Sequence, residues 1–98
     1  MKLMISQPMN GKTTEQIKAE RAEIIKALNA EGHEVINTIF VDEPPHGDKA
    51  IYYLSKSIEA MSTVDGVVFM RGWEKARGCK IEHEIATAYG LFVRELGE

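Results

Sequence analysis

The stretch Gly66-Val-Val-Phe-Met70, followed directly by Arg71-Gly-Trp-Glu-Lys-Ala-Arg-Gly-Cys-Lys-Ile-Glu-His-Glu-Ile-Ala-Thr-Ala-Tyr-Gly90, decides the fold. Its short apolar run is typical of a buried strand. Gly72 and Gly78 bracket a polar turn, and a helix is expected to follow and to end at Gly90, because glycine adopts the left-handed conformation that terminates helices. A strand, a glycine-bounded turn and a helix N-terminus in succession form a corner suited to binding an anion or another polar ligand.

Glu82 is the candidate reactive residue of this corner. We place the start of the helix near Lys80, which puts Glu82 in its first turn. The helix dipole favours a carboxylate there, so we expect Glu82 to be ionised and available as a nucleophile or base. Acidic residues are also common in first turns. Spacing alone therefore leaves two interpretations open, an ordinary first-turn acid and a catalytic one.

The rest of the chain alternates between strand-like and helix-like segments. Strands are predicted at residues 3–5, 33–41, 67–70 and 91–93, and helices at residues 14–30, 49–62 and about 80–90. Thr13 and Gln16 have the spacing of a capping box before the first helix. Apolar residues recur at helical spacing and give both longer helices a buried stripe. These stripes are Ile17, Ile24, Ile25 and Leu28 in the first helix, and Ile51, Leu54, Ile58 and Met61 in the second.

This order predicts the fold class. Alternating strands and helices form a parallel sheet with helices on both faces and right-handed crossovers. We expect one α/β domain over residues 1–98, a small flavodoxin- or Rossmann-like sheet of about four strands, with a polar tail from residue 94 onward. Ligands of such sheets bind at the carboxyl ends of the strands. The loops after the first and third strands should meet there.

The loop after the first strand is Ser6-Gln-Pro-Met-Asn-Gly11. Pro8 and the turn dipeptide Asn10-Gly11 interrupt regular structure. The loop lacks the GxxxxGK[ST] pattern of a P-loop. Its backbone amides and hydroxyls suit a polar ligand, but a plain connection from strand to helix explains the same residues.

Composition excludes several classes of function. The formal net charge is −3, which gives no electrostatic case for nucleic acid or a membrane surface as a partner. The lone Cys79 fits a reducing compartment, and without a long apolar stretch or signal-peptide pattern we expect a soluble, cytoplasmic protein. His46 is better explained as a loop residue than as a ligand contact, because the other histidines show no metal-ligand spacing to it. We expect no metal and no cofactor.

Four segments together resemble the DUF4406 family, small bacterial and phage proteins that are similar to nucleoside 2-deoxyribosyltransferases. The resemblance covers nearly the whole chain. In the wider superfamily a glutamate is followed by small residues at +4, +6 and +8, as Glu82 is here by Ala86, Ala88 and Gly90. The four segments are Ser6-Gln-Pro-Met-Asn-Gly11, Asp65-Gly-Val-Val-Phe, Gly72-Trp-Glu and the stretch from Gly78 to Gly90.

The resemblance implies N-glycosidic bond cleavage or transfer on a nucleoside or deoxynucleotide, with Glu82 as the nucleophile. It also implies a homo-oligomer. Trp73 would stack on the base or shield the site, and Arg77 would pair with a phosphate, although both also suit a structural role in the turn or an interface. The residues implied to bind substrate are Ser6, Gln7, Met9, Asn10, Gly11, Gly72, Trp73, Arg77 and Gly78.

The chain departs from the pattern of the related enzymes at several positions. Ser57 stands where an aspartate assists departure of the base. Gln7 replaces a glycine, Ala76 a serine and Met4 a tyrosine. A second function therefore stays open beside the enzymatic one, a non-catalytic protein that binds a nucleotide or a nucleotide-derived signal. An oligomer without any small ligand leaves both polar loops unexplained.

Overall fold

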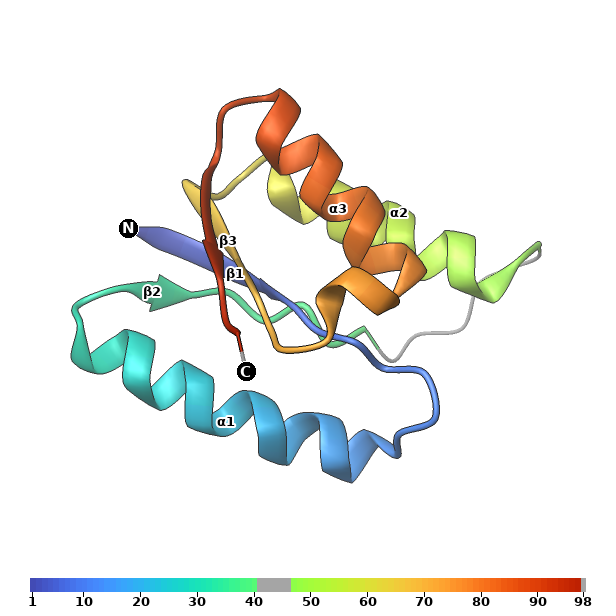
Figure 1. The fold of residues 1–98 in the computed structure, drawn as a ribbon, viewed down its shortest axis with the longest axis horizontal. Helices are drawn as coiled ribbons and strands as arrows, with labels where there is room; N and C mark the ends of the chain where they lie inside the picture. Colours follow the sequence, from blue (N-terminus) through green and yellow to red (C-terminus); the bar gives the residue numbers. More distant parts are fainter. Residues whose placement is uncertain (41–46, 98) are drawn as a thin grey trace.

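The structure, a computed structural model, describes residues 1–40 and 47–97. Strands and helices alternate along the chain, as the sequence predicts (Figure 1). The predicted loop at residues 42–48 falls largely outside the described residues, and His46 falls wholly outside them. The elements are β1 (Lys2–Ser6), α1 (Thr14–Ala30), β2 (Glu34–Val35), α2 (Lys49–Met61), β3 (Gly66–Phe69), the 3₁₀ turn η1 (Trp73–Lys75), α3 (Arg77–Ala88) and β4 (Phe92–Glu95).

The four strands form one parallel sheet in the order β2-β1-β3-β4. Helix α1 covers one face, and α2 and α3 lie together on the other (Figure 1). The chain moves outward from β1 to β2 and then returns to the opposite side of β1 for β3. The strand order therefore reverses between β1 and β3, and the predicted α/β fold class is confirmed.

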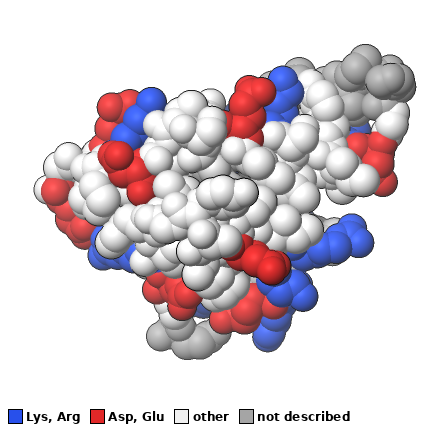
Figure 2. Space-filling model, turned by 90° about the horizontal axis from the view of Figure 1, so that it is seen from above, with Lys and Arg blue, Asp and Glu red and all other residues white. Residues whose placement is uncertain are grey.

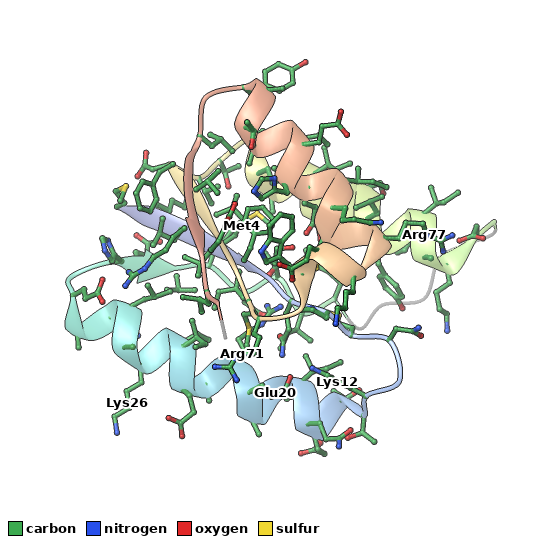
Figure 3. All side chains as sticks on the ribbon, in the orientation of Figure 1. Met4, Lys12, Glu20, Lys26, Arg71 and Arg77 are labelled. Carbon is green, nitrogen blue, oxygen red and sulfur yellow. The ribbon has the colours of Figure 1, made fainter. Side chains whose placement is uncertain are left out.

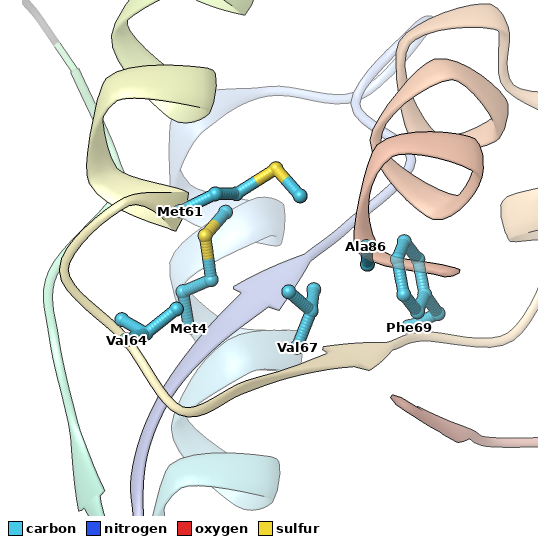
Figure 4. Packing of buried hydrophobic residues seen from close by; sticks show 6 residues of the cluster. All are labelled: Met4, Met61, Val64, Val67, Phe69 and Ala86. Carbon is cyan, nitrogen blue, oxygen red and sulfur yellow. The ribbon is translucent and has the colours of Figure 1, made fainter. Parts of the chain in front are cut away.

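The core forms two apolar layers, one on each face of the sheet. Successive side chains of a strand point to opposite faces, so the buried strands β1 and β3 supply both layers. The first layer, under α2 and α3, consists of Met4, Met61, Val64, Val67, Phe69 and Ala86 (Figure 4). The second, under α1, consists of Leu3, Ile5, Leu28 and Val68. Apolar area removed from water in these layers drives the helices onto the sheet.

Helix α1 has the predicted bounds and the predicted cap. The Thr13 hydroxyl accepts a hydrogen bond from the Gln16 amide at 3.1 Å, and the Gln16 side chain accepts one from the Thr13 amide at 2.8 Å. Ile17 and Leu28 are buried on the predicted face. The same face also buries Arg21, which is 3 % exposed and was not expected there.

The second strand is much shorter than predicted. Among the described residues 33–40, only Glu34 and Val35 pair with β1, where residues 33–41 had been expected to form a strand. The Asn37 side chain accepts the Ile39 amide at 2.9 Å, and the Thr38 hydroxyl donates to the Ile5 carbonyl oxygen at 3.3 Å. Polar side chains thus form hydrogen bonds with backbone groups that would otherwise pair with a neighbouring strand. The chain therefore leaves the sheet after β2.

The last two elements also differ from the prediction. Helix α3 begins at Arg77 rather than near Lys80. Strand β4 runs to Glu95, and the Leu96 amide still donates to the Phe69 carbonyl oxygen at 2.8 Å, so residues 94–96 belong to the sheet rather than to a free tail. Among the helices of the described ranges, each is too short or too polar to cross a membrane.

Candidate functional site

A cleft of about 1110 Å³ opens at the carboxyl ends of β1 and β3, where the strand order reverses. Its walls come from the loop after β1, from the turn after β3 and from parts of all three helices. The two glycine-containing loops therefore meet at this edge, as parallel-sheet topology predicts.

Glu82 lies on the wall of this cleft and is only 6 % exposed. The hydroxyl of Ser6, the last residue of β1, donates to Glu82 Oε1 at 2.5 Å. Because α3 begins at Arg77, Glu82 belongs to its second turn, and the expected first-turn position is wrong. Burial raises the pKa of the Glu82 carboxyl, while Ser6, Ser57 and the charge of Arg21 lower it in part. Burial and these neighbours, rather than a first-turn position near the helix N-terminus, therefore set the pKa of Glu82.

Arg21 forms the floor of the site with two polar partners. Its Nε donates to Gln7 Oε1 at 2.9 Å and its Nη1 donates to Thr38 Oγ1 at 2.8 Å. Gln7 in turn donates to the Ile17 carbonyl oxygen at 3.0 Å and to Glu20 Oε1 at 3.1 Å. Burial lowers the pKa of Arg21 to about 10, and Glu82 opposes this shift. The guanidinium therefore stays charged at neutral pH.

Cys79 lines the same cleft as Arg21 and Glu82 and lies one helical turn before Glu82 on α3. Its side chain is 5 % exposed. Burial raises the pKa of the thiol, an effect that Ser6 and Arg21 reduce and Glu82 strengthens. A buried thiol with a raised pKa is a poor nucleophile at neutral pH, because the thiolate is the reactive form.

The structure brings most of the predicted binding residues to the cleft and leaves two away from it. Gly11 lies in the exposed turn before α1. Trp73 packs against the core, with its ring stacked on His83 at 4.1 Å between centroids and tilted against Phe69. It is not among the cleft-lining residues, so stacking on a ligand is not what this geometry offers. The cleft is lined by Ser6, Gln7, Met9, Asn10, Gly72, Arg77 and Gly78, together with Glu82.

Three further residues bear on acid–base chemistry. Ser57 of α2 lines the cleft, and its side chain lowers the pKa of the Glu82 carboxyl through a hydrogen bond. Asp48 also lines the cleft, but its carboxylate caps α2 by accepting the Ile51 amide at 3.0 Å. Asp65 precedes β3 at the opposite edge of the sheet, where it accepts the Lys2 amide at 2.7 Å. Asp65 therefore cannot assist Glu82 within one chain.

The lining of the cleft includes exposed apolar side chains. Met9, Ile51 and Ile81 line the cleft and are 40 %, 68 % and 38 % exposed, respectively. Ile51 had been predicted to lie in the buried stripe of α2, and that prediction is wrong. Apolar residues at helical spacing identify the apolar face of a helix. The pattern does not show whether that face packs in the core or lines an open cleft.

Neither sign of charge dominates the face of the molecule that Figure 2 shows. Acidic and basic side chains alternate there around a largely uncharged area. Some charges are paired, as in Lys12 and Glu20, whose Nζ and Oε1 lie 2.9 Å apart (Figure 3). Arg77 sits at the N-terminal end of α3, at the rim of the cleft.

Sequence reasoning missed Arg21 and Thr38. A signal for Arg21 is present, because it lies four residues after Ile17 and seven before Leu28, in the middle of the apolar stripe of α1. A charged residue at such a position is buried against polar partners or extends past the stripe. Thr38 gives no comparable signal, because its partners are distant in sequence.

The fold and the cleft define a small α/β protein with a cleft at the carboxyl edge of a parallel sheet. The sequence model of DUF4406, described as a domain of unknown function, matches residues 1–95, so the chain belongs to this family. No curated protein and no solved structure matches the chain.

Proposed function

We propose that the cleft binds a nucleoside or deoxynucleotide and that Glu82 cleaves or transfers its N-glycosidic bond. The observation that carries this proposal is the position of Glu82, a carboxylate held by Ser6 on the wall of a cleft at the switch point of the sheet. Carboxylates in such sites act as nucleophiles towards anomeric carbons. The spacing of small residues after Glu82, which resembles that of nucleoside 2-deoxyribosyltransferases, favours the same assignment.

The chemical step would follow the logic of retaining glycosidases. A Glu82 oxygen bonds to the anomeric carbon while the bond from that carbon to the base nitrogen breaks, and its electron pair leaves with the base. The leaving nitrogen takes a proton from solvent or from a group of the cleft. Water or a second base then attacks the anomeric carbon and gives up a proton to solvent or to a group of the cleft, and the bond from that carbon to the Glu82 oxygen breaks to release the carboxylate.

A 5′-phosphate would fit the N-terminal end of α3. Arg77 precedes Glu82 by five residues, which corresponds to roughly 7.5 Å along a helix axis. This separation is of the same order as that between the anomeric carbon and the phosphorus of a nucleotide. The N-cap Ala76 offers no side-chain cap, and free amides at a helix N-terminus bind phosphate well.

Ligand binding without turnover is the second candidate function. Ser57 lies beside Glu82 at the position where the related enzymes carry an assisting aspartate. Asp48, the acid that lines the cleft with Glu82, is engaged in capping α2. Within the described residues the cleft then has one available carboxylate and no free acid to protonate the base, and such a site would hold its ligand intact.

Turnover distinguishes the two functions. We expect purified protein incubated with nucleosides and 5′-monophosphates, both ribo and deoxy, to release free base in molar excess over protein. Chromatography quantifies the base, and thermal shift on the same samples reports binding. A thermal shift with the ligand recovered intact would overturn the enzymatic proposal and support the binding one.

Arg77→Met provides the matched test of the phosphate site within this panel. Losing a charge-assisted contact should raise KM for a monophosphate about tenfold to a hundredfold and leave a nucleoside unaffected. Lys80→Met is the control, because Lys80 is exposed on the next turn of α3 and does not line the cleft. An equal rise in KM for the monophosphate in the two variants would show that Arg77 is not part of the proposed phosphate site.

We also propose that a second copy of the chain covers the mouth of the cleft. Three residues that line the cleft, Met9, Ile51 and Ile81, have exposed apolar side chains, and exposed apolar surface can mark an interaction site. Light scattering at micromolar concentration should show a dimer or larger assembly, and Ile51→Lys should shift it towards monomer. A wild-type monomer at that concentration would contradict the proposal.

A further inference from the structure

The floor of the cleft contains a buried cation that neither the family description nor the proposed reaction assigns. Arg21 is 3 % exposed and reaches the cleft from α1, the helix on the opposite face of the sheet from α3. Burying a guanidinium is costly unless it is hydrogen-bonded and its charge is compensated. The identity of the compensating group therefore indicates what the cation does.

The hydrogen bonds of Arg21 explain its position but not its charge. Its partners, the Gln7 amide oxygen and the Thr38 hydroxyl, are both neutral. Through them Arg21 joins the loop after β1 to the segment after β2. A neutral donor such as glutamine could make contacts of the same kind, so the need for a charge arises elsewhere.

Glu82 is a buried acid in the lining of the same cleft, and Ser6, which binds it, is the chain neighbour of Gln7, which binds Arg21. The groups that surround the Glu82 carboxyl come from each element around it: Ser6 from β1, Ser57 from α2, Cys79 from α3 and Arg21 from α1. Arg21 is the cation of this set, while the hydroxyls and the thiol are neutral at pH 7. The opposite charges of Glu82 and Arg21 attract each other. Each charge therefore opposes the shift that burial causes in the pKa of the other residue.

We propose that Arg21 is a positioning residue that keeps the Glu82 side chain in its charged form and fixes the two loops that frame it. Arg21 need not touch the ligand for either role. The inference concerns the same site as the proposed function and rests on it for its consequence in catalysis. The ionisation of Glu82 itself can be measured without any substrate.

Substitution by lysine and by glutamine separates the charge of Arg21 from its hydrogen bonds. Arg21→Lys keeps the charge and loses the planar fork, whereas Arg21→Gln keeps a donor and loses the charge. We expect the carboxyl ¹³C signal of Glu82 to titrate at higher pH in Arg21→Gln than in wild type, and near the wild-type pH in Arg21→Lys. If the Glu82 carboxyl titrated at the same pH in all three proteins, Arg21 would not keep Glu82 in its charged form, even if base release were confirmed.

The acid limb of the pH profile for base release should follow the same order. Each unit by which it moves to higher pH costs about tenfold in rate on the acid side. A purely structural role for Arg21 would lower the rate at every pH without moving the limb. A wild-type protein that binds ligand but releases no base would leave the titration result standing and overturn only the enzymatic proposal.

A double-mutant cycle tests the pairing through stability. Removing Arg21 leaves the Glu82 charge buried without compensation, so Glu82→Gln should partly restore stability to Arg21→Gln at pH 7. If Arg21→Gln fails to fold, the double variant should fold. Lys26→Met removes a charge from the exposed side of α1, and its effect should simply add to that of Glu82→Gln (Figure 3). Additive effects for Arg21 and Glu82 as well would overturn the inference.

Discussion

Glu82→Gln is expected to lower the rate of base release by about a thousandfold or more while the protein stays folded. The amide has nearly the shape of the carboxylate and can still accept the Ser6 hydroxyl hydrogen bond. It cannot form a glycosyl ester, because its nitrogen and oxygen are weak nucleophiles. Initial rates of base release from a monophosphate, with thermal shift for binding, measure both properties.

Relative to wild type, the same variant should gain stability as the pH rises from acidic to neutral and alkaline values. Burial raises the pKa of Glu82 in the folded protein, so the folded state binds its proton more tightly than the unfolded chain does. Ionising this group therefore costs stability as pH rises from the ordinary glutamate pKa through the raised folded value. Below the ordinary pKa both states are protonated, and the difference in stability between the two proteins should no longer change with pH. Urea unfolding across this pH range gives the comparison.

Glu84→Gln is the matched control, because Glu84 is exposed two residues further along α3. It should leave the rate of base release unchanged. Wild-type rates in Glu82→Gln would show that the nucleophile is wrongly assigned. A loss of stability relative to wild type as the pH rises from acidic to neutral would show that the buried carboxylate is stabilised rather than strained by its surroundings.

Local signals in the sequence predicted the elements best where each element depends on its own residues. Helix α1 was predicted at its observed bounds, because its capping box and its apolar spacing both lie within the helix. Helix α3 begins earlier than predicted, because Gly78 was interpreted as a turn residue although it lies inside the helix. The intrinsic preference of glycine against helices is weak enough for tertiary packing to override it.

The site was less predictable because its chemistry depends on contacts between distant segments. Topology was sufficient to bring Ser6 and Glu82 to one edge of the sheet, although 76 residues separate them in sequence. The direction in which the pKa of Glu82 shifts was not predictable, since it depends on burial and on the charge of Arg21 in another helix. Trp73 illustrates the opposite case, because a side chain expected at the ligand stacks on His83 instead.

Gly66→Ala is expected to destabilise the fold by about 1–3 kcal/mol. Gly66 is the first residue of β3, between Leu3 of β1 and Phe92 of β4. A Cβ added there would lie 2.7 Å from the Phe92 carbonyl oxygen and 2.7 Å from its Cβ. The carbonyl belongs to the backbone of the paired strand, so the clash is relieved only if β4 moves away from β3. Urea unfolding followed by far-UV circular dichroism measures the loss.

Gly78→Ala provides the control for the chemical change itself. Gly78 lies in the first turn of α3, and a Cβ added there would meet nothing within 4 Å. Alanine is preferred over glycine within a helix by roughly 0.5–1 kcal/mol, so this variant should be as stable as wild type or slightly more stable. Hydrogen exchange would show where Gly66→Ala acts, with faster exchange expected first at the β4 amides that pair with β3. A Gly66→Ala protein as stable as Gly78→Ala would mean that the β3–β4 spacing adapts to a methyl group, and that glycine at this position does not set the strand separation.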